Sequence, residues 1–273
     1  MSTPSQTPVS GEKRPSEFST LEAVSVTVPK SDVSEAVSFV LRVLPAADPT
    51  APVLLVLPAI AMKAKFYLPL AKSLHAAGLS AATVDLRAQG ESTPPLGEAA
   101  NHGYRQLLEA DLPAILDALQ ERFPEAPIYL VGHSLGGQLS LLYGAAHPDR
   151  LAGVITIATG VVFWRAFELK RWVSVLYGSQ YVGVVSRLRG VWPGGKVMGG
   201  PMAGGVMADW SWHALTGRYQ PAGSMRTEVI IVRPRAPAAA AGRIRPRWRR
   251  APGSAPPRRP APPGSGPSAS SPR

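Results

Sequence analysis

Two spacings of apolar residues alternate along the first 160 residues of the chain. Strands buried on both faces of a parallel sheet are predicted by short apolar runs at residues 52–58, 80–86, 127–131 and 151–158. An edge hairpin is predicted by the alternating residues 22–29 and 36–44. Between the runs, apolar residues recur at helical spacing, as at Leu108, Leu112 and Ile115. This order predicts an α/β fold with a mainly parallel sheet and helices on both faces.

The pattern changes after residue 160. Residues 161–225 hold five of the six tryptophans and several glycine pairs, which favours a cap inserted after the sixth strand, over the carboxyl edge of the sheet. One further core strand is predicted within residues 226–232. We therefore divide the chain into five segments. They are a disordered N-terminus (residues 1–20), an α/β core (21–160), a cap (161–225), a possible added core strand (226–232) and a disordered tail (233–273).

The charge is concentrated in the last segment. The formal net charge is +11, but residues 226–273 contain 11 arginines and a single acid, whereas residues 1–225 have a net charge of only +1. Apart from Ile244 and Trp248, residues 233–273 are all Ala, Pro, Arg, Gly or Ser, from which no core can be built. Such an amino-acid composition is typical of a GC-rich gene that is translated in the wrong reading frame. We interpret it as a frameshift product that replaces the C-terminal part of the fold, and expect no nucleic-acid partner, the basic tail being the only hint of one.

Several classes of protein are excluded by residues that the chain lacks. Without cysteine there are no disulfides, thiolate metal sites or cysteine nucleophile. There is no Gly-rich phosphate loop and no His and carboxylate cluster at metal-ligand spacing, so we expect neither cofactor nor metal. The N-terminus has no apolar signal region, and the longest apolar stretch, about ten residues, is too short for a membrane span. We expect a cytoplasmic protein.

One motif carries candidate chemistry. Gly132-x-Ser134-x-Gly136 follows a predicted buried strand and precedes a predicted helix, which is the context of a nucleophile elbow. There the serine sits at a strained turn, and small neighbours let adjacent chains approach. We expect Ser134 to be a nucleophile and the backbone N–H of Leu135 to donate to an oxyanion, with Ile60 N–H as the second donor. The alternative is a Gly-rich turn with an idle serine.

The chain resembles the α/β-hydrolase superfamily in further segments beside the elbow. The loop after the fourth strand resembles a D-x-R-G-x-G-x-S loop, as Asp85-x-Arg87-x-Gln89-Gly90-x-Ser92. A subgroup of bacterial hydrolases is similar at residues 57–61, where Ala61 replaces a glycine, at Lys65-Phe66-Tyr67, and in the cap at 208–212 and 217–219. The likeness covers about residues 22–225. It implies serine hydrolysis of a small-molecule ester, thioester or amide, of the esterase or lipase kind.

Such a hydrolase also needs a base that takes the serine proton and a carboxylate that orients the base. His147 and Asp149 lie at the far end of the helix that starts at the elbow, roughly 15 Å from the serine at 1.5 Å per residue. Asp209 and His213, one helical turn apart in the cap, remain as a candidate acid and base. The alternative is that this pair only holds the cap together.

The superfamily's own acid and histidine are expected after later strands, beyond Val232. That part of the chain contains no Asp, Glu or His. We therefore predict an impaired serine hydrolase, and keep as the alternative a catalytically inactive protein of the same fold that acts in binding.

Overall fold

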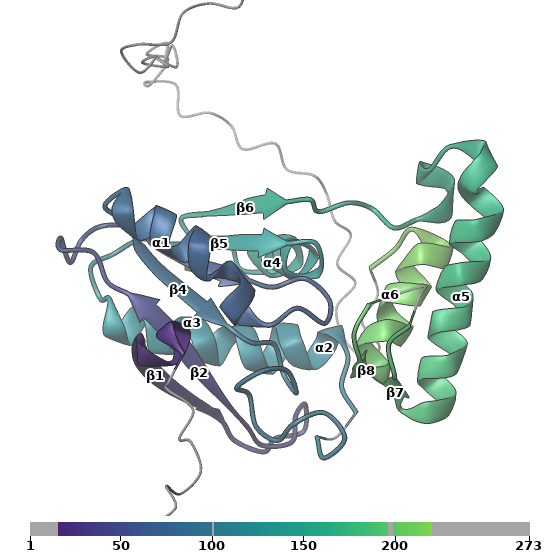
Figure 1. The fold of residues 1–273 in the computed structure, drawn as a ribbon, viewed down its shortest axis with the longest axis horizontal. Coiled ribbons are helices and arrows are strands. Elements are labelled where there is room, and N and C mark those ends of the chain that lie inside the picture. The colour runs from purple at the N-terminus through teal and green to yellow at the C-terminus, as the bar shows by residue number, and fades with distance from the viewer. Residues whose placement is uncertain (1–15, 100, 196–198, 220–273) are drawn as a thin grey trace, which may run out of the picture. The chain divides into compact units, whose positions relative to one another are not determined.

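The computed structural model describes residues 16–99, 101–195 and 199–219 (Figure 1). The predicted added strand at 226–232 and the tail at 233–273 lie outside the described residues, as do residues 1–15. The N-terminal prediction is wrong for residues 17–20, which form a 3-10 turn, η1 (Glu17–Thr20). This turn is ordered because Phe18 is buried, 7% exposed.

A six-stranded mixed sheet forms the core, in the order β1-β2-β4-β3-β5-β6 (Figure 1). Its strands are β1 (Glu22–Val28), β2 (Val37–Leu44), β3 (Val53–Leu57), β4 (Ser80–Val84), β5 (Ile128–His133) and β6 (Gly153–Ile157). The last four run parallel, whereas β1 and β2 form the antiparallel hairpin at one edge. The predicted α/β fold with a mainly parallel sheet is confirmed.

Helices cover both faces of this sheet. They are η2 (Ala64–Tyr67), α1 (Leu68–Ala76), α2 (Tyr104–Gln106), the π-helical η3 (Leu107–Asp111), α3 (Leu112–Arg122), α4 (Leu135–Ala146) and η4 (Pro148–Arg150). Alternate residues of β3 point to opposite faces, which explains its unbroken apolar run. Val53, Leu55 and Leu57 join the core that includes α3 and α4, while Leu54 and Val56 pack with residues of η2 and α1.

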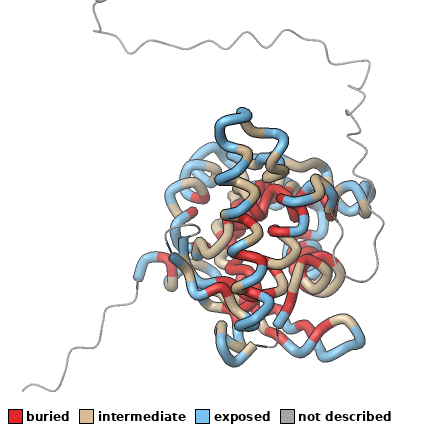
Figure 2. The backbone as a smooth tube through the Cα atoms, turned by 90° about the vertical axis from the view of Figure 1, so that its right-hand side faces the viewer, coloured by how far each residue is buried: buried red, intermediate tan, exposed pale blue. Residues whose placement is uncertain are grey.

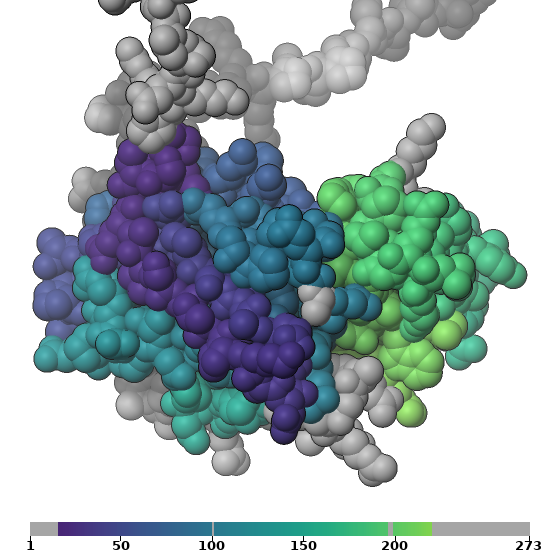
Figure 3. All heavy atoms as spheres, turned by 90° about the horizontal axis from the view of Figure 1, so that it is seen from below, coloured from purple at the N-terminus to yellow at the C-terminus, as the bar shows by residue number. Residues whose placement is uncertain are grey.

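The cap follows β6 and forms a second, mostly helical layer at one end of the core (Figures 1 and 3). It consists of η5 (Trp164–Ala166), η6 (Leu169–Arg171), α5 (Trp172–Arg189), β7 (Val191–Trp192), β8 (Met202–Ala203) and α6 (Gly204–Thr216). α5 and α6 lie so close together that a Cβ at Gly183 would overlap Ser211. The boundary at residue 160 between core and cap stays a prediction.

The carboxyl ends of three parallel strands lie level. Leu57 of β3 is paired with Gly132 of β5, and His133 of β5 with Ile157 of β6. The cap reaches this edge, since a Cβ at Gly200 would lie 3.1 Å from the Cβ of Ala61. Because the strand ends lie level, the loops after β3 and β5 meet at this edge. In open α/β sheets ligands bind at such an edge.

Candidate active site

Ser134 forms the turn between β5 and α4. Its backbone has φ 51° and ψ −110°, a conformation that L-residues adopt only at a cost. The turn is held on both sides, because Ser134 N donates to Ile157 O at 3.0 Å and Ser134 O accepts from Gln138 N at 3.0 Å. Within the described residues, Ser134 Oγ has no hydrogen-bond partner. The local geometry is that expected of a nucleophile elbow.

The glycines around Ser134 are required by close approaches of the backbone. A Cβ at Gly132 would overlap the backbone of Gly136 and Gly137, and a Cβ at Gly136 would overlap Leu57 O. These approaches press the first turn of α4 against the end of β3. The spacing of the motif is therefore explained by steric exclusion at this turn.

The loop after β3 lies beside the start of α4. Gly136 N donates to Pro58 O at 3.1 Å, and Met62 N closes the turn on Ala59 O at 3.1 Å. Ala61 has φ 55°, in the region that favours glycine, so the alanine at this position is strained.

Both predicted oxyanion donors flank the Gly136–Pro58 hydrogen bond in sequence. In the described ranges, the backbone N–H groups of Leu135 and Ile60 have no hydrogen-bond partner. An unpaired N–H in the first turn of a helix is suited to binding negative charge. Leu135 N follows Ser134 directly in the chain, and the Gly136–Pro58 hydrogen bond holds the loop that carries Ile60 N at the start of the same helix.

Tyr67, which the sequence reasoning did not select, connects this loop to the elbow. Its hydroxyl accepts from Ala59 N at 2.9 Å and lies 2.7 Å from His133 Nδ1. The ring is 9% exposed and meets the imidazole edge-on. His133 is thereby directed to Tyr67 through the ring nitrogen Nδ1. The only signal in the sequence was the tyrosine of the Lys65-Phe66-Tyr67 match.

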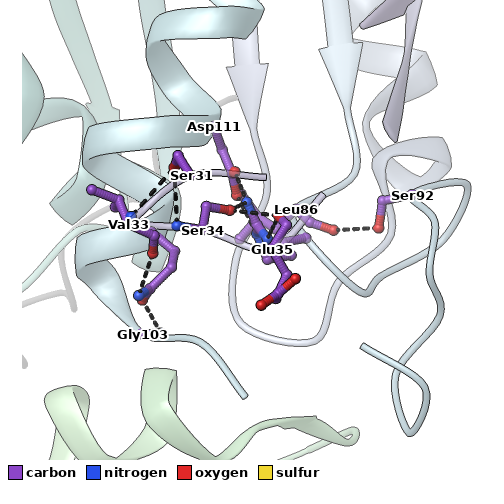
Figure 4. Close-up of polar contacts among 10 residues, drawn as sticks. Ser31, Val33, Ser34, Glu35, Leu86, Ser92, Gly103 and Asp111 are labelled. Atoms are coloured by element: carbon purple, nitrogen blue, oxygen red, sulfur yellow. Dashed lines mark hydrogen bonds and ion pairs between the residues drawn. The ribbon is translucent and has the colours of Figure 1, made fainter. Parts of the chain in front are cut away.

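The loop after β4 supports the site without carrying reactive groups. Asp85 accepts from Ala64 N at 2.7 Å and from Glu91 N at 3.0 Å, so its carboxylate ties this loop to the start of η2. A Cβ at Gly90 would overlap that carboxylate. Ser92 Oγ donates to Leu86 O at 3.0 Å (Figure 4). The resemblance at residues 85–92 is thus explained by loop geometry.

Arg87 of the same loop forms a buried ion pair with Asp111. The guanidinium also donates to Ser34 Oγ at 2.6 Å and to Glu35 O at 3.1 Å (Figure 4). Burial raises the pKa of Asp111, and the hydrogen bond and charge of Arg87 oppose that rise. These contacts fasten the β1–β2 connection to the helix that follows residue 103.

The candidate acid and base are not brought together. Asp209 Oδ2 accepts from Tyr104 N at 2.8 Å, at the start of α2, and a Cβ at Gly103 would overlap this carboxylate. Burial raises the pKa of Asp209, against the effects of the Tyr104 amide and of Arg187. No hydrogen bond joins Asp209 to His213 within the described residues. Asp209 instead acts as a cap for the α2 helix, supplied from α6.

His213 is 1% exposed and stacks on Tyr219 with ring centroids 3.7 Å apart. Among the described residues, neither ring nitrogen has a hydrogen-bond partner. Burial lowers the pKa of His213, since a charged imidazole loses its hydration there. These contacts fit the alternative reading, in which the residue stabilises the cap.

Other polar residues near the elbow serve the packing. Gln138, one turn beyond Ser134, accepts from Tyr104 Oη at 2.9 Å and donates to Gly160 O at 3.1 Å, which joins α4 to the entry of the cap. His147 packs against Tyr143 with the ring centroids 4.6 Å apart and the planes tilted, at the opposite end of α4 from Ser134. The described part of the chain holds no group of three or more His, Cys, Asp or Glu that could bind a metal ion.

The strand order, the elbow and the loop after β3 define the class of the protein as an α/β hydrolase. A family model described as serine aminopeptidase, S33, matches residues 48–198, which is more than half of the chain, and the chain belongs to this family.

Curated relatives match a shorter part. Rat monoglyceride lipase is 38% identical over 53 residues, covering 19% of this chain and 18% of the lipase. The human monoglyceride lipase is 37% identical over 43 residues, covering 16% of this chain and 14% of the lipase. The chain thus spans less than a fifth of the length of the curated relatives it matches.

Solved structures superpose over a longer part of the chain. A protein from Agrobacterium vitis S4 described as a hydrolase superposes with a TM-score of 0.50 at 16% identity, covering 70% of this chain and 71% of that chain. A thermostable carboxyl esterase from Bacillus coagulans, in complex with glycerol, has a TM-score of 0.45 at 22% identity, covering 60% and 52%. These likenesses concern the fold alone.

Proposed function

We propose that the chain is a serine hydrolase that cleaves a carboxylic ester, or a thioester or amide, through an acyl-enzyme on Ser134. The observation that carries this proposal is the backbone of Ser134 at φ 51° between β5 and α4, where the loop after β3 is hydrogen-bonded to the start of α4. Membership of the serine aminopeptidase S33 family supports it. The monoglyceride lipase and esterase descriptions of similar proteins support an ester-type substrate.

The first half of the proposed reaction forms the acyl-enzyme. Ser134 Oγ attacks the acyl carbon and loses its proton, the carbonyl oxygen becomes an oxyanion that accepts from Leu135 N and Ile60 N, and the alcohol leaves with a proton. In the second half, water attacks the acyl carbon, the bond to Oγ breaks, Oγ takes up a proton that the water gives up, and the acid is released. The backbone amides act in both halves, because both pass through an oxyanion.

We further propose that the proton transfers are slow. Within the described residues, no hydrogen bond brings a histidine to Ser134 Oγ; His133 Nδ1 is directed to Tyr67, and neither ring nitrogen of His213 is paired. Loss of acid and base from a serine hydrolase reduces the rate by about 10⁴–10⁶. A serine at an intact elbow with its amides can still react with strong electrophiles.

A fluorophosphonate probe tests this proposal, because it reacts with an activated serine and needs no turnover. We expect labelling of the full chain that is lost in Ser134→Ala. The matched control is Ser73→Ala, an exposed serine on α1. Labelling that persists in Ser134→Ala, or is absent in the folded wild type, contradicts the proposed nucleophile.

Because no histidine is hydrogen-bonded to Ser134 Oγ within the described residues, we also consider a second candidate function. It is a non-catalytic protein of this fold that binds a ligand at the carboxyl edge of the sheet. It differs from the first in predicting a folded chain that neither reacts with the probe nor hydrolyses p-nitrophenyl esters. Ester hydrolysis that requires Ser134 excludes it. Hydrolysis that also disappears in a His213→Ala protein with wild-type stability would show that this histidine acts as the base.

A further inference from the structure

The outer face of the cap carries a stripe of exposed apolar side chains. Their spacing of three or four residues places them on one face of η6 and α5. Each is between 53% and 81% exposed: Leu169, Val173, Tyr177, Tyr181, Val184 and Leu188, which we call the α5 stripe. α5 is thus apolar on a face that no described element covers.

The remaining faces of α5 show that this exposure is not a general property of the helix. Val182 and Ser186 are fully buried, and Gly183 lies against Ser211 of α6. Figure 1 shows α5 as the element farthest from the sheet, with α6 between them, and Figure 2 looks onto that side of the molecule. At 1.5 Å per residue the 18-residue helix is about 27 Å long. A continuous apolar surface of this length on a folded protein marks a contact surface.

Exposed basic residues stand at both ends of the stripe. Lys170 and Arg171 precede α5, and Arg187 and Arg189 end it. η6 and α5 contain no acid, and Glu168, directly before η6, is paired with Lys170 at 2.7 Å, so residues 168–189 carry a net charge of +3. Cations at the start of a helix oppose its dipole, so the first two do not stabilise α5. The net positive charge of this segment favours a negatively charged partner.

This charge pattern selects between two kinds of partner. If the stripes of two copies paired, in either direction, basic ends would meet basic ends, and like charges in an interface are unfavourable. An anionic lipid surface complements the net positive charge of this segment while it accepts the apolar side chains. Tyr177 and Tyr181 suit the same boundary, since each has an apolar ring and a polar hydroxyl.

We propose that the α5 stripe docks the protein on an anionic phospholipid bilayer, with α5 lying in the plane of the surface. The apolar side chains enter the boundary between headgroups and acyl chains, and the basic residues Arg171 and Arg189 at the two ends of the stripe contact lipid phosphates. α5 lies on the surface and does not cross it, since in the described part of the chain no helix is sufficiently long and apolar to span a membrane. The proposal does not depend on catalysis by Ser134.

The absence of cysteine allows a direct test with the full chain. An environment-sensitive dye is attached to Val184→Cys in the stripe, or to Glu121→Cys, an exposed position on α3, as the control. With vesicles that mix phosphatidylglycerol and phosphatidylcholine, we expect the emission at position 184 to rise and shift to the blue, with no change at 121. Pure phosphatidylcholine should give a much smaller response, because each cation on an anionic surface adds about fivefold in affinity.

Position 184 separates this proposal from two others. Residues 226–273 carry a net charge of +10 and also attract anionic vesicles. If the protein binds vesicles while the dye at 184 stays in water, those residues or another surface bind, and the proposal is wrong. A blue shift that grows with protein concentration and needs no vesicles means that a second copy covers the stripe, which also overturns it.

A pair of substitutions gives the quantitative test. Leu188→Ser removes the most exposed residue of the stripe, and we expect the affinity for the mixed vesicles to fall about tenfold or more. The matched control is Leu141→Ser, an exposed leucine on α4 outside the stripe, which should leave the affinity unchanged. Equal affinities of the two variants refute the role of α5. Because both side chains are exposed, both variants are expected to fold.

Discussion

The contact between Tyr67 and the loop after β3 allows the sharpest prediction. Tyr67→Phe removes one hydroxyl and keeps the ring. In the wild type this oxygen accepts from Ala59 N at 2.9 Å and pairs with His133 Nδ1 at 2.7 Å. The substitution therefore leaves the Ala59 amide without its acceptor, in a loop whose neighbouring residue supplies the proposed oxyanion donor, Ile60 N.

Two magnitudes follow from this geometry. A buried donor that loses its partner costs about 1–3 kcal/mol, so the free energy of unfolding should fall by that amount. If the loop after β3 instead rearranges so that the Ala59 amide finds another acceptor, the amide of Ile60 changes its orientation as well. Loss of one oxyanion donor lowers the rate by about 10²–10³. We expect slower reaction of Ser134 in Tyr67→Phe, and, if turnover is measurable, a lower kcat with little change in KM.

The assay is the rate of fluorophosphonate labelling beside urea unfolding of the same preparations. Tyr143→Phe is the control, since Tyr143 is 2% exposed and makes no hydrogen bond through its hydroxyl among the described residues. His133→Asn places an acceptor near the position of Nδ1 and should react faster than His133→Leu. A Tyr67→Phe protein that is less stable but labels at the wild-type rate would refute the positioning role, because Tyr67 would then contribute only to packing.

Three further changes test the packing around the site by urea unfolding. Gly136→Ala should destabilise the fold by about 1–3 kcal/mol or more, since its Cβ meets backbone, whereas Gly160→Ala, with open space around it, should change stability by less than about 0.5 kcal/mol. Arg87→Met should cost about 3–5 kcal/mol, because it leaves the carboxylate of Asp111 buried without its partner, and a smaller loss would mean that water reaches that carboxylate. The pKa of His213 is lower in the native state than in the unfolded chain, so below about pH 6.5 the unfolded chain binds a proton that the native state does not bind. The free energy of unfolding is therefore unaffected by this histidine above about pH 6.5 and decreases as the pH falls below it. His213→Phe should remove that loss, by at most about 1.4 kcal/mol per pH unit, and an unchanged pH profile would contradict the burial of a neutral imidazole.

Local spacing was sufficient for the features that depend on neighbours in the chain. The unbroken apolar run at β3 predicted a strand covered on both faces, because successive side chains of a strand point to opposite sides. The glycines at 132 and 136 predicted the tight turn at Ser134, because a Cβ at either would overlap backbone close by in the fold. The two-period alternation over the first 160 residues predicted the mixed, mainly parallel sheet.

Choices among distant partners needed the tertiary structure. Asp209 and His213 are spaced for contact on a helix, yet the carboxylate bonds to the amide of Tyr104, 105 residues away, and the imidazole stacks on Tyr219. Tyr67 reaches His133 across 66 residues, which no periodicity encodes. Sequence determined the sheet and the strained turn because both arise from local sterics. Only the tertiary structure decided which polar groups form hydrogen bonds, because donor and acceptor from separate segments must come within about 3 Å of each other. A spacing of four residues along one helix allows two side chains to interact but does not require it.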